Sequence, residues 1–127
     1  MTTYTFTKLV VGDLDAMYRF YSEVYGFDSR GRVTLQIGSE PVEEIMLGMA
    51  GEHGGLILLT FPERPAPPRG EVILGITTPD LSALIDKVVA AGGAMHTPPF
   101  TSKETGGIQF AFVTDPEGHL TELVQLA

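Results

Sequence analysis

The chain has 127 residues, 43% of them hydrophobic, and its 8 Lys and Arg against 16 Asp and Glu give a formal net charge of −8. This composition is typical of one globular domain that folds without covalent cross-links. The absence of cysteine excludes disulfides, thiolate metal sites and thiol catalysis, and it fits a reducing cytoplasm. The acidic balance, without a stripe of Lys and Arg, argues against binding nucleic acid or an anionic membrane through charge. Neither a signal-peptide pattern nor a run of about 18 apolar residues is found, so we expect neither export nor a membrane span.

An internal repeat organises the chain. Residues 9–16 match residues 76–83, 67 positions further along, and the same offset carries Gly26 onto Gly93. Each copy has an extended run, an Asp suited to cap a helix, a helical stretch and a glycine at which the helix must end. Apolar residues at spacings of three and four predict that both helices cover a sheet. They are Leu14, Met17, Tyr18, Tyr21 and Val24 in the first copy, and Leu81, Leu84, Ile85, Val88 and Val89 in the second.

Short strand-like runs follow each helix. They cover Arg32–Ile37, Glu44–Met49 and Leu56–Phe61 in the first half, and Ala94–Thr97, Gln109–Thr114 and Leu120–Gln125 in the second. The turn Asp115-Pro116-Glu117-Gly118 predicts a hairpin before the last strand. The pattern predicts an α+β fold of two tandem βαβββ modules within one domain, residues 1–127. Module one covers about residues 3–61, a proline-rich linker residues 62–70, and module two about residues 71–126.

Two motifs carry a family resemblance. The first is the helix segment Phe20-Tyr21-Ser22-Glu23-Val24-Tyr25-Gly26-Phe27, and the second is the closing segment from Asp115 to Leu123. In this order they resemble the vicinal oxygen chelate superfamily, which includes glyoxalase I, extradiol dioxygenases, and fosfomycin and bleomycin resistance proteins. The resemblance covers about residues 4 to 126. It implies the paired βαβββ fold but leaves the reaction open, because this scaffold hosts many chemistries.

The resemblance also implies where a metal would bind. Metal-binding members supply ligands from the first and last strand of each module, and these positions map onto Phe6, Leu58, Ile73 and Glu122. Only Glu122 can coordinate a metal, because the other three side chains have no lone pairs. The implied assignment is therefore the metal-free branch, with no metal and no cofactor, and it argues against glyoxalase I and dioxygenase activities for this chain.

Strand alternation predicts the lining of a cavity. Phe6 and Lys8 fall on one face of the first strand, and Glu122 falls on the cavity face of the last. We expect Phe6, Lys8, Leu58, Ile73 and Glu122 to contact a small molecule in this apolar cavity. Three roles stay open for Glu122: a structural carboxylate held by Lys8 or backbone donors, a group that recognises the ligand, or a catalytic base. Lys8 has the alternative of reaching solvent at the strand end.

Three hypotheses about function follow. The first is a metal-independent binding protein for a small, largely apolar or aromatic metabolite or drug, for which the acidic charge would favour a cationic ligand. The second is a metal-free lyase or isomerase that uses Glu122 as general base. The third, a purely structural domain, predicts no ligand-sized cavity. We further expect a cytoplasmic homodimer, because a lone chain would expose part of an apolar lining.

Overall fold

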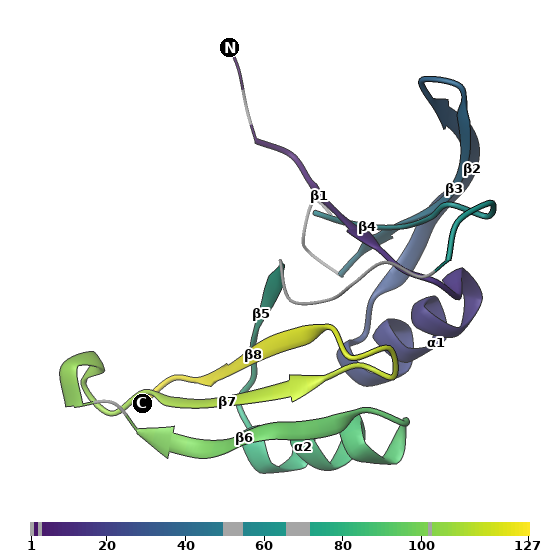
Figure 1. Cartoon of the computed structure of the whole chain (residues 1–127). Helices are drawn as coiled ribbons and strands as arrows, with labels where there is room; N and C mark the ends of the chain where they lie inside the picture. The colour runs from purple at the N-terminus through teal and green to yellow at the C-terminus, as the bar shows by residue number, and fades with distance from the viewer. Residues whose placement is uncertain (1, 3, 50–54, 66–71, 102) are drawn as a thin grey trace. The chain divides into compact units, whose positions relative to one another are not determined.

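A computed structural model describes residues 2, 4–49, 55–65, 72–101 and 103–127. The chain forms two compact units, Met1–Pro68 and Arg69–Ala127. The last five residues of the expected proline-rich linker, 66–70, lie outside the described residues. So do residues 3 and 50–54 of the expected first module and residues 71 and 102 of the second. Figure 1 shows the elements of each unit in chain order.

The first unit is a four-stranded sheet with one helix. Its elements are β1 (Thr7–Val10), α1 (Leu14–Tyr25), β2 (Asp28–Ile37), β3 (Glu40–Gly48) and β4 (Leu56–Thr60). The strand order is β1-β4-β3-β2, with β1 parallel to β4 and the other pairs antiparallel. Strands β2 and β3 each begin four residues earlier than the sequence pattern predicts, because their pairing runs the full length of a long hairpin, from Ile37 with Glu40 beside the turn to Asp28 with Gly48 at the far end.

The second unit repeats this topology. Its elements are β5 (Ile73–Thr77), α2 (Leu81–Ala90), β6 (Ala94–Thr101), a short 3-10 turn (Lys103–Thr105), β7 (Gln109–Thr114) and β8 (Leu120–Gln125). The order is β5-β8-β7-β6, again with one parallel pair, between β5 and β8. The predicted α+β fold of two βαβββ modules is therefore confirmed. Strand β6 extends four residues beyond the expected Thr97, through Pro98 and Pro99, because an edge strand tolerates residues that cannot donate to the ladder.

Both helices are capped at their N-termini by the predicted aspartates. Asp13 accepts a hydrogen bond from the Ala16 amide, and Asp80 accepts one from the Ala83 amide, each at 3.0 Å. The first helix ends at Tyr25 and is followed by the predicted Gly26, whose φ of 84° is left-handed. The second helix ends at Ala90, three residues before the expected glycine. Gly93 has a different role, because a Cβ there would collide with the Thr114 carbonyl oxygen.

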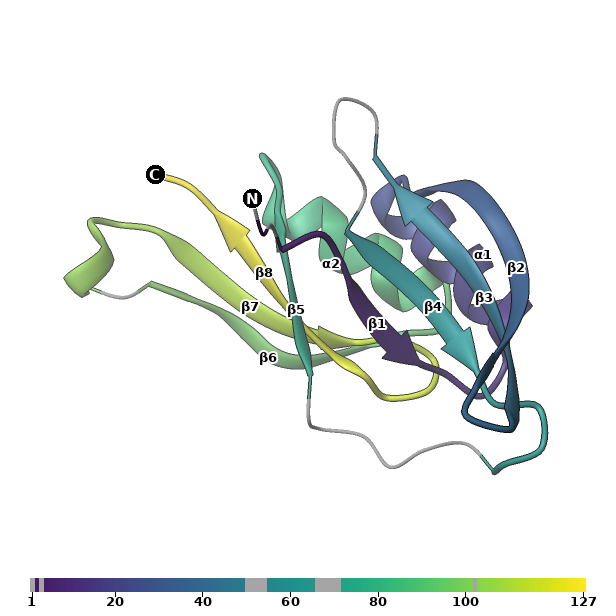
Figure 2. The same cartoon turned by 90° about the horizontal axis from the view of Figure 1, so that it is seen from above.

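Each helix covers one face of its own sheet. In Figure 2 the helix α1 runs along the sheet that contains β3 and β4. Most of the predicted stripe residues are buried between helix and sheet. Two positions differ: Val89 was expected in the second stripe but is 53% exposed, and Phe20, which the first stripe omitted, is buried. The buried apolar residues of the first unit include Leu9, Val11, Met17, Phe20, Tyr21 and Leu58, and those of the second include Leu81, Val88, Ala111, Val113 and Leu123. Side chains that alternate with these point to the other face of each sheet, away from its helix, which is called the open face below.

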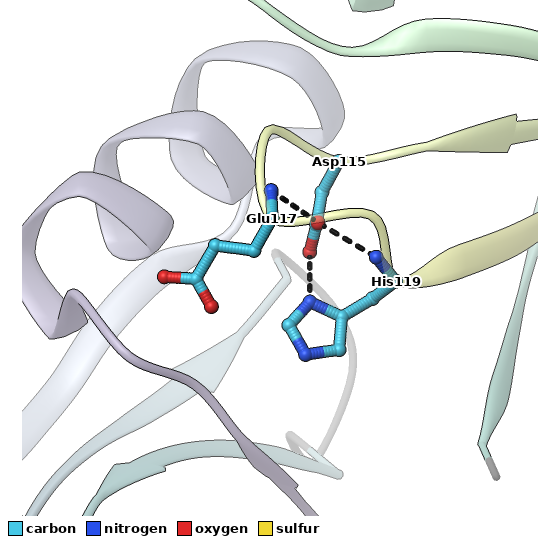
Figure 3. A network of polar contacts seen from close by, with 3 residues as sticks. All are labelled: Asp115, Glu117 and His119. Carbon is cyan, nitrogen blue, oxygen red and sulfur yellow. Dashed lines mark hydrogen bonds and ion pairs between the residues drawn. The ribbon is translucent and has the colours of Figure 1, made fainter. Parts of the chain in front are cut away.

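The turn between β7 and β8 is held by a buried carboxylate. Asp115 Oδ1 accepts hydrogen bonds from the backbone amides of Glu117 and His119, both at 2.9 Å, and Asp115 Oδ2 lies 2.8 Å from His119 Nδ1 (Figure 3). Both side chains are buried. The predicted hairpin is therefore stabilised by the Asp115 side chain as well as by its Pro-Glu-Gly sequence. Asp115 also orders the segment that leads into β8, the strand that carries Glu122.

Replacing Asp115 with Ala should destabilise the protein by roughly 3 kcal/mol, because two amides and an imidazole would lose a buried, charge-assisted acceptor. Asp115→Asn should cost less, since its side-chain oxygen can still accept from the two amides. Urea unfolding followed by circular dichroism measures both. An Asp115→Ala variant within 0.5 kcal/mol of the parent would show that the network is dispensable.

Candidate functional site

The open face of the first sheet carries the predicted Phe6 and Lys8. In the parallel pairing of β1 with β4, Lys8 lies opposite Ile57. In the antiparallel pairing of β3 with β4, Ile57 lies opposite Met46. Paired residues point to the same face, so Lys8, Ile57 and Met46 share it, and Phe6, two residues before Lys8, joins them. Phe6 is 48% exposed, and the centroid of its ring lies 5.7 Å from Lys8 Nζ.

The expectation that Leu58 belongs to this face is wrong. Leu58 pairs with Leu9 and Ile45 and is fully buried on the helix-covered face. The repeat offset of 67 residues makes Lys8 of the first module equivalent to Gly75 of the second. Lys8 pairs with Ile57, and Gly75 pairs with Glu122. Ile57 is therefore the counterpart of Glu122 in the first module. The error has a simple cause, because a shift of one residue along a strand moves every side chain to the other face.

A hollow of about 280 Å³ opens within the first unit. Its lining is mostly apolar and includes one charged side chain. The lining residues are Thr5, Phe6, Arg30, Met46, Leu47, Gly55, Leu56 and Ile57. Phe6 and Ile57 are thus both walls of this hollow and positions at which the family resemblance implies metal ligands. The charged side chain is Arg30, which the sequence analysis did not predict as a site residue.

Lys8 forms an ion pair that the sequence did not reveal. Its Nζ lies 2.5 Å from Glu44 Oε2, and the Glu44 side chain is only 4% exposed against 32% for Lys8. Glu44 lies opposite Leu59, so it is on the same open face as Lys8. The pair spans β1 and β3 across the central strand. Glu44 is one of three glutamates in β3, and only the pairing of this strand with β4 places it on the face of Met46 and Lys8.

In the second unit, Ile73 and Glu122 also share a face. Ile73 lies opposite Leu120, and Glu122 lies opposite Gly75 on one side and Phe112 on the other. Ile73 is exposed, and Glu122 is half-buried. Within the described part of the chain, no hydrogen bond or ion pair engages the Glu122 carboxylate. Lys8 is therefore not its observed partner, and of the predicted site residues the structure brings together Phe6 with Lys8 and Ile73 with Glu122.

The donor set does not fit a metal ion. With the corrected register, the four implied ligand positions carry Phe6, Ile57, Ile73 and Glu122, of which only Glu122 offers a lone pair. Divalent ions such as Zn, Ni, Mn and Fe need several N or O ligands from the protein. Across residues 4–49, 55–65 and 72–127 without residue 102, no group of three or more His, Cys, Asp and Glu residues is arranged to hold a metal. No reaction step through a metal is derived for this chain.

The Lys8 and Glu44 pair gives a direct stability test. Lys8→Met should destabilise the protein by about 3 kcal/mol, the low end for breaking a buried pair, because Glu44 would remain buried without a counter-charge. The double variant Lys8→Met, Glu44→Leu should recover most of this loss. Denaturant unfolding of both single variants and the double variant measures the coupling. A double variant as unstable as the sum of the singles would show that the two groups act independently.

Comparison with known proteins places the chain in a family. The model of the Glyoxalase/Bleomycin resistance protein/Dioxygenase superfamily matches residues 3–123. A protein from Vibrio cholerae named as a probable lactoylglutathione lyase is 33% identical over 129 residues, which cover 94% of this chain and 87% of that protein. Lactoylglutathione lyase GLX1 of Arabidopsis thaliana is 34% identical over 119 residues. That match covers 91% of this chain but 41% of the plant protein, so the chain spans less than half of it.

Solved structures share the fold at low sequence identity. A glyoxalase family protein from Bacillus cereus superposes with a TM-score of 0.83 at 18% identity, over 98% of this chain and 94% of that one. The fosfomycin resistance protein FosX from Listeria monocytogenes gives a TM-score of 0.70 at 16% identity, over 100% and 95%. No helix within the described ranges is long and apolar enough to cross a membrane. The chain belongs to the Glyoxalase/Bleomycin resistance protein/Dioxygenase superfamily.

Proposed function

We propose that this chain binds a small, largely apolar or aromatic organic molecule without a metal ion. One observation carries the proposal: Phe6 and Ile57, which stand at two implied ligand positions, instead contribute hydrocarbon to the wall of a hollow of about 280 Å³. A concave, mostly apolar surface with few polar groups is the usual composition of a small-molecule site. The same hollow argues against a purely structural domain.

The size of the hollow limits the ligand. Its volume lies just under the usual range for drug-sized ligands, so it suits a body of one or two rings. Burying about 150 Å² of apolar ligand surface yields roughly 4 kcal/mol before the cost of association is subtracted. Contact with the Phe6 ring and the adaptable Met46 side chain adds to this. Apolar contact alone therefore supports weak binding, and tight binding needs a polar anchor as well.

The names of the relatives suggest an activity for this chain, which is stated here as part of the proposal. Two relatives are named as lactoylglutathione lyases, and FosX is named as a fosfomycin resistance protein. We infer that this chain has the small-molecule binding role of its superfamily without the metal-dependent chemistry, because three of its four implied ligand positions are Phe6, Ile57 and Ile73. A cytoplasmic location is part of the same proposal and is supported by the absence of cysteine.

A metal-free lyase or isomerase is the second candidate. It is favoured by Glu122, whose half-buried carboxylate lies between Gly75 and Phe112 and has no partner within the described residues. A general base needs an accessible carboxylate within hydrogen-bond reach of a substrate proton. Turnover that is lost in Glu122→Gln while ligand binding is retained would favour this candidate over a binding protein.

The binding proposal predicts that removing metal has no effect. Protein dialysed against EDTA should contain well under one Zn, Ni, Mn or Fe per chain and should bind 2-naphthylmethanol as well as before dialysis, because the hollow offers hydrocarbon contacts. Elemental analysis and isothermal titration calorimetry measure the two properties. About one metal per chain, lost in Glu122→Gln, would contradict the proposal.

A matched pair of variants controls this experiment. Phe6→Ala should weaken binding of 2-naphthylmethanol severalfold, because the ring forms part of the hollow. Tyr4→Ala removes an aromatic ring that is 79% exposed and does not line the hollow, so it should leave the affinity unchanged. Equal effects of the two substitutions would place the binding site elsewhere.

A homodimer is a further part of the proposal. It is supported by apolar side chains exposed on the sheet of the second unit, among them Ile73 and Phe100, because large apolar patches are uncommon on monomers. Light scattering at micromolar concentration should give twice the 13.7 kDa mass of one chain. A mass that stays at 13.7 kDa across that range would refute the dimer.

A further inference from the structure

We propose that the hollow of the first unit recognises an organic carboxylate, with Arg30 as the residue that binds the carboxylate group. The inference rests on the proposed function, since it takes the hollow to be the binding site, and it adds the chemical class of the ligand. The apolar walls contributed by Phe6, Met46 and Ile57 would hold an aryl or alkyl body, and Arg30 is the one charged group in the lining.

Arg30 is placed by a β-bulge. Ser29 pairs with Leu47 and Gly31 pairs with Met46, so Arg30 is the extra residue between two successive pairs of the ladder. A bulge re-aims the side chain of its extra residue and recurs next to binding and active sites. The two residues on the facing strand, Leu47 and Met46, both line the hollow, so the bulge lies at its rim.

Gly48 makes room for the Arg30 side chain. A Cβ added at Gly48 would lie 2.8 Å from Arg30 Nε and 3.0 Å from Cζ, which is closer than van der Waals contact allows. The guanidinium therefore lies directly over the glycine. Arg30 Nη2 also donates a hydrogen bond of 3.0 Å to the Met49 carbonyl oxygen. Bulge, glycine and carbonyl together hold the planar fork in one place, which lowers the entropy lost when a ligand binds.

The local charge around the hollow favours an anion. The positive charge of Lys8, near Phe6, is matched by Glu44. Arg32 and Arg64 are likewise paired, and their hydrogen bonds to Asp15 and Glu40 lower the pKa of both carboxyls. By contrast, no carboxylate among the described residues pairs with Arg30.

This local charge outweighs the charge of the whole chain. A net charge of −8 favours a cationic ligand at long range, but salt screens that field beyond about 8 Å at physiological ionic strength. At contact distance, a guanidinium with free donors binds a planar carboxylate through two parallel hydrogen bonds. Carboxylate recognition at the hollow is therefore compatible with an acidic protein.

Two probes that differ in one group test the proposal. 2-Naphthoate and 2-naphthylmethanol share the same ring system, but only the first is anionic. Calorimetric titration of the parent protein should show 2-naphthoate binding about tenfold more tightly, a difference of about 1.4 kcal/mol. Arg30→Gln should reduce this preference to less than threefold and leave the affinity for 2-naphthylmethanol unchanged. Arg19→Gln, on the exposed side of α1, removes the same charge from the same unit and should keep the preference.

A second variant tests the position of Arg30 rather than its charge. Gly48→Ala keeps the arginine but displaces its guanidinium, so it should lower the preference for 2-naphthoate severalfold. An Arg30→Gln protein that still prefers 2-naphthoate tenfold would overturn the inference and leave the proposed function standing. Failure of the parent protein to bind either probe would overturn the proposed function and the inference with it.

Discussion

The parallel pairing of β1 with β4, and of β5 with β8, is the constraint on which the rest of the structure depends. Each pairing joins the first and last strand of a module side by side, and its register decides which side chains face the helix and which face outward. In the first module this register sends Leu58 into the core and Ile57 to the open face. In the second it sends Glu122 outward. A shift of one residue in either register would turn the core side chains of a strand to the open face and its open-face side chains into the core.

The open face of the first sheet carries hydrocarbon side chains at the implied ligand positions. Hydrocarbon from Phe6 and Ile57 occupies positions where metal-binding members are implied to carry ligands, and it forms part of a hollow instead. Three charged side chains lie on or beside this face, and they differ in their contacts. Lys8 and Glu44 neutralise each other across the sheet, whereas Arg30 is held at the rim by a bulge and a glycine. These features favour recognition of an organic molecule over coordination of an ion.

Sequence patterns predicted the parts of this structure that depend on local chemistry. The capping aspartates Asp13 and Asp80, the apolar stripes of both helices and the hairpin turn at Asp115 each follow from side-chain chemistry within a few residues. The repeat then predicted the topology, because two similar segments fold alike. Alternation predicted that Phe6, Lys8 and Glu122 face a cavity. The strand registers set Lys8 beside Ile57 and Glu122 beside Gly75, and contact of these residues with a ligand stays a prediction.

The missed features depend on contacts between distant segments. Leu58 was assigned by aligning two strands without a known register, and an error of one residue suffices to reverse a face. Glu44 becomes the partner of Lys8 only because β3 and β1 flank the same central strand. Arg30 stands out only through a bulge and the absence of a side chain at Gly48, and neither leaves a periodic pattern in the sequence.

The central claim is that a small organic molecule binds in the apolar hollow of the first unit without metal. Backbone amide chemical shifts, recorded by NMR while 2-naphthoate is added to EDTA-treated protein, test it most directly. The account predicts saturable shifts concentrated at Phe6, Arg30, Met46 and Ile57, unchanged when Zn²⁺ is added. Shifts that appear only with Zn²⁺, or that cluster around Glu122 and leave the first unit unaffected, would contradict it.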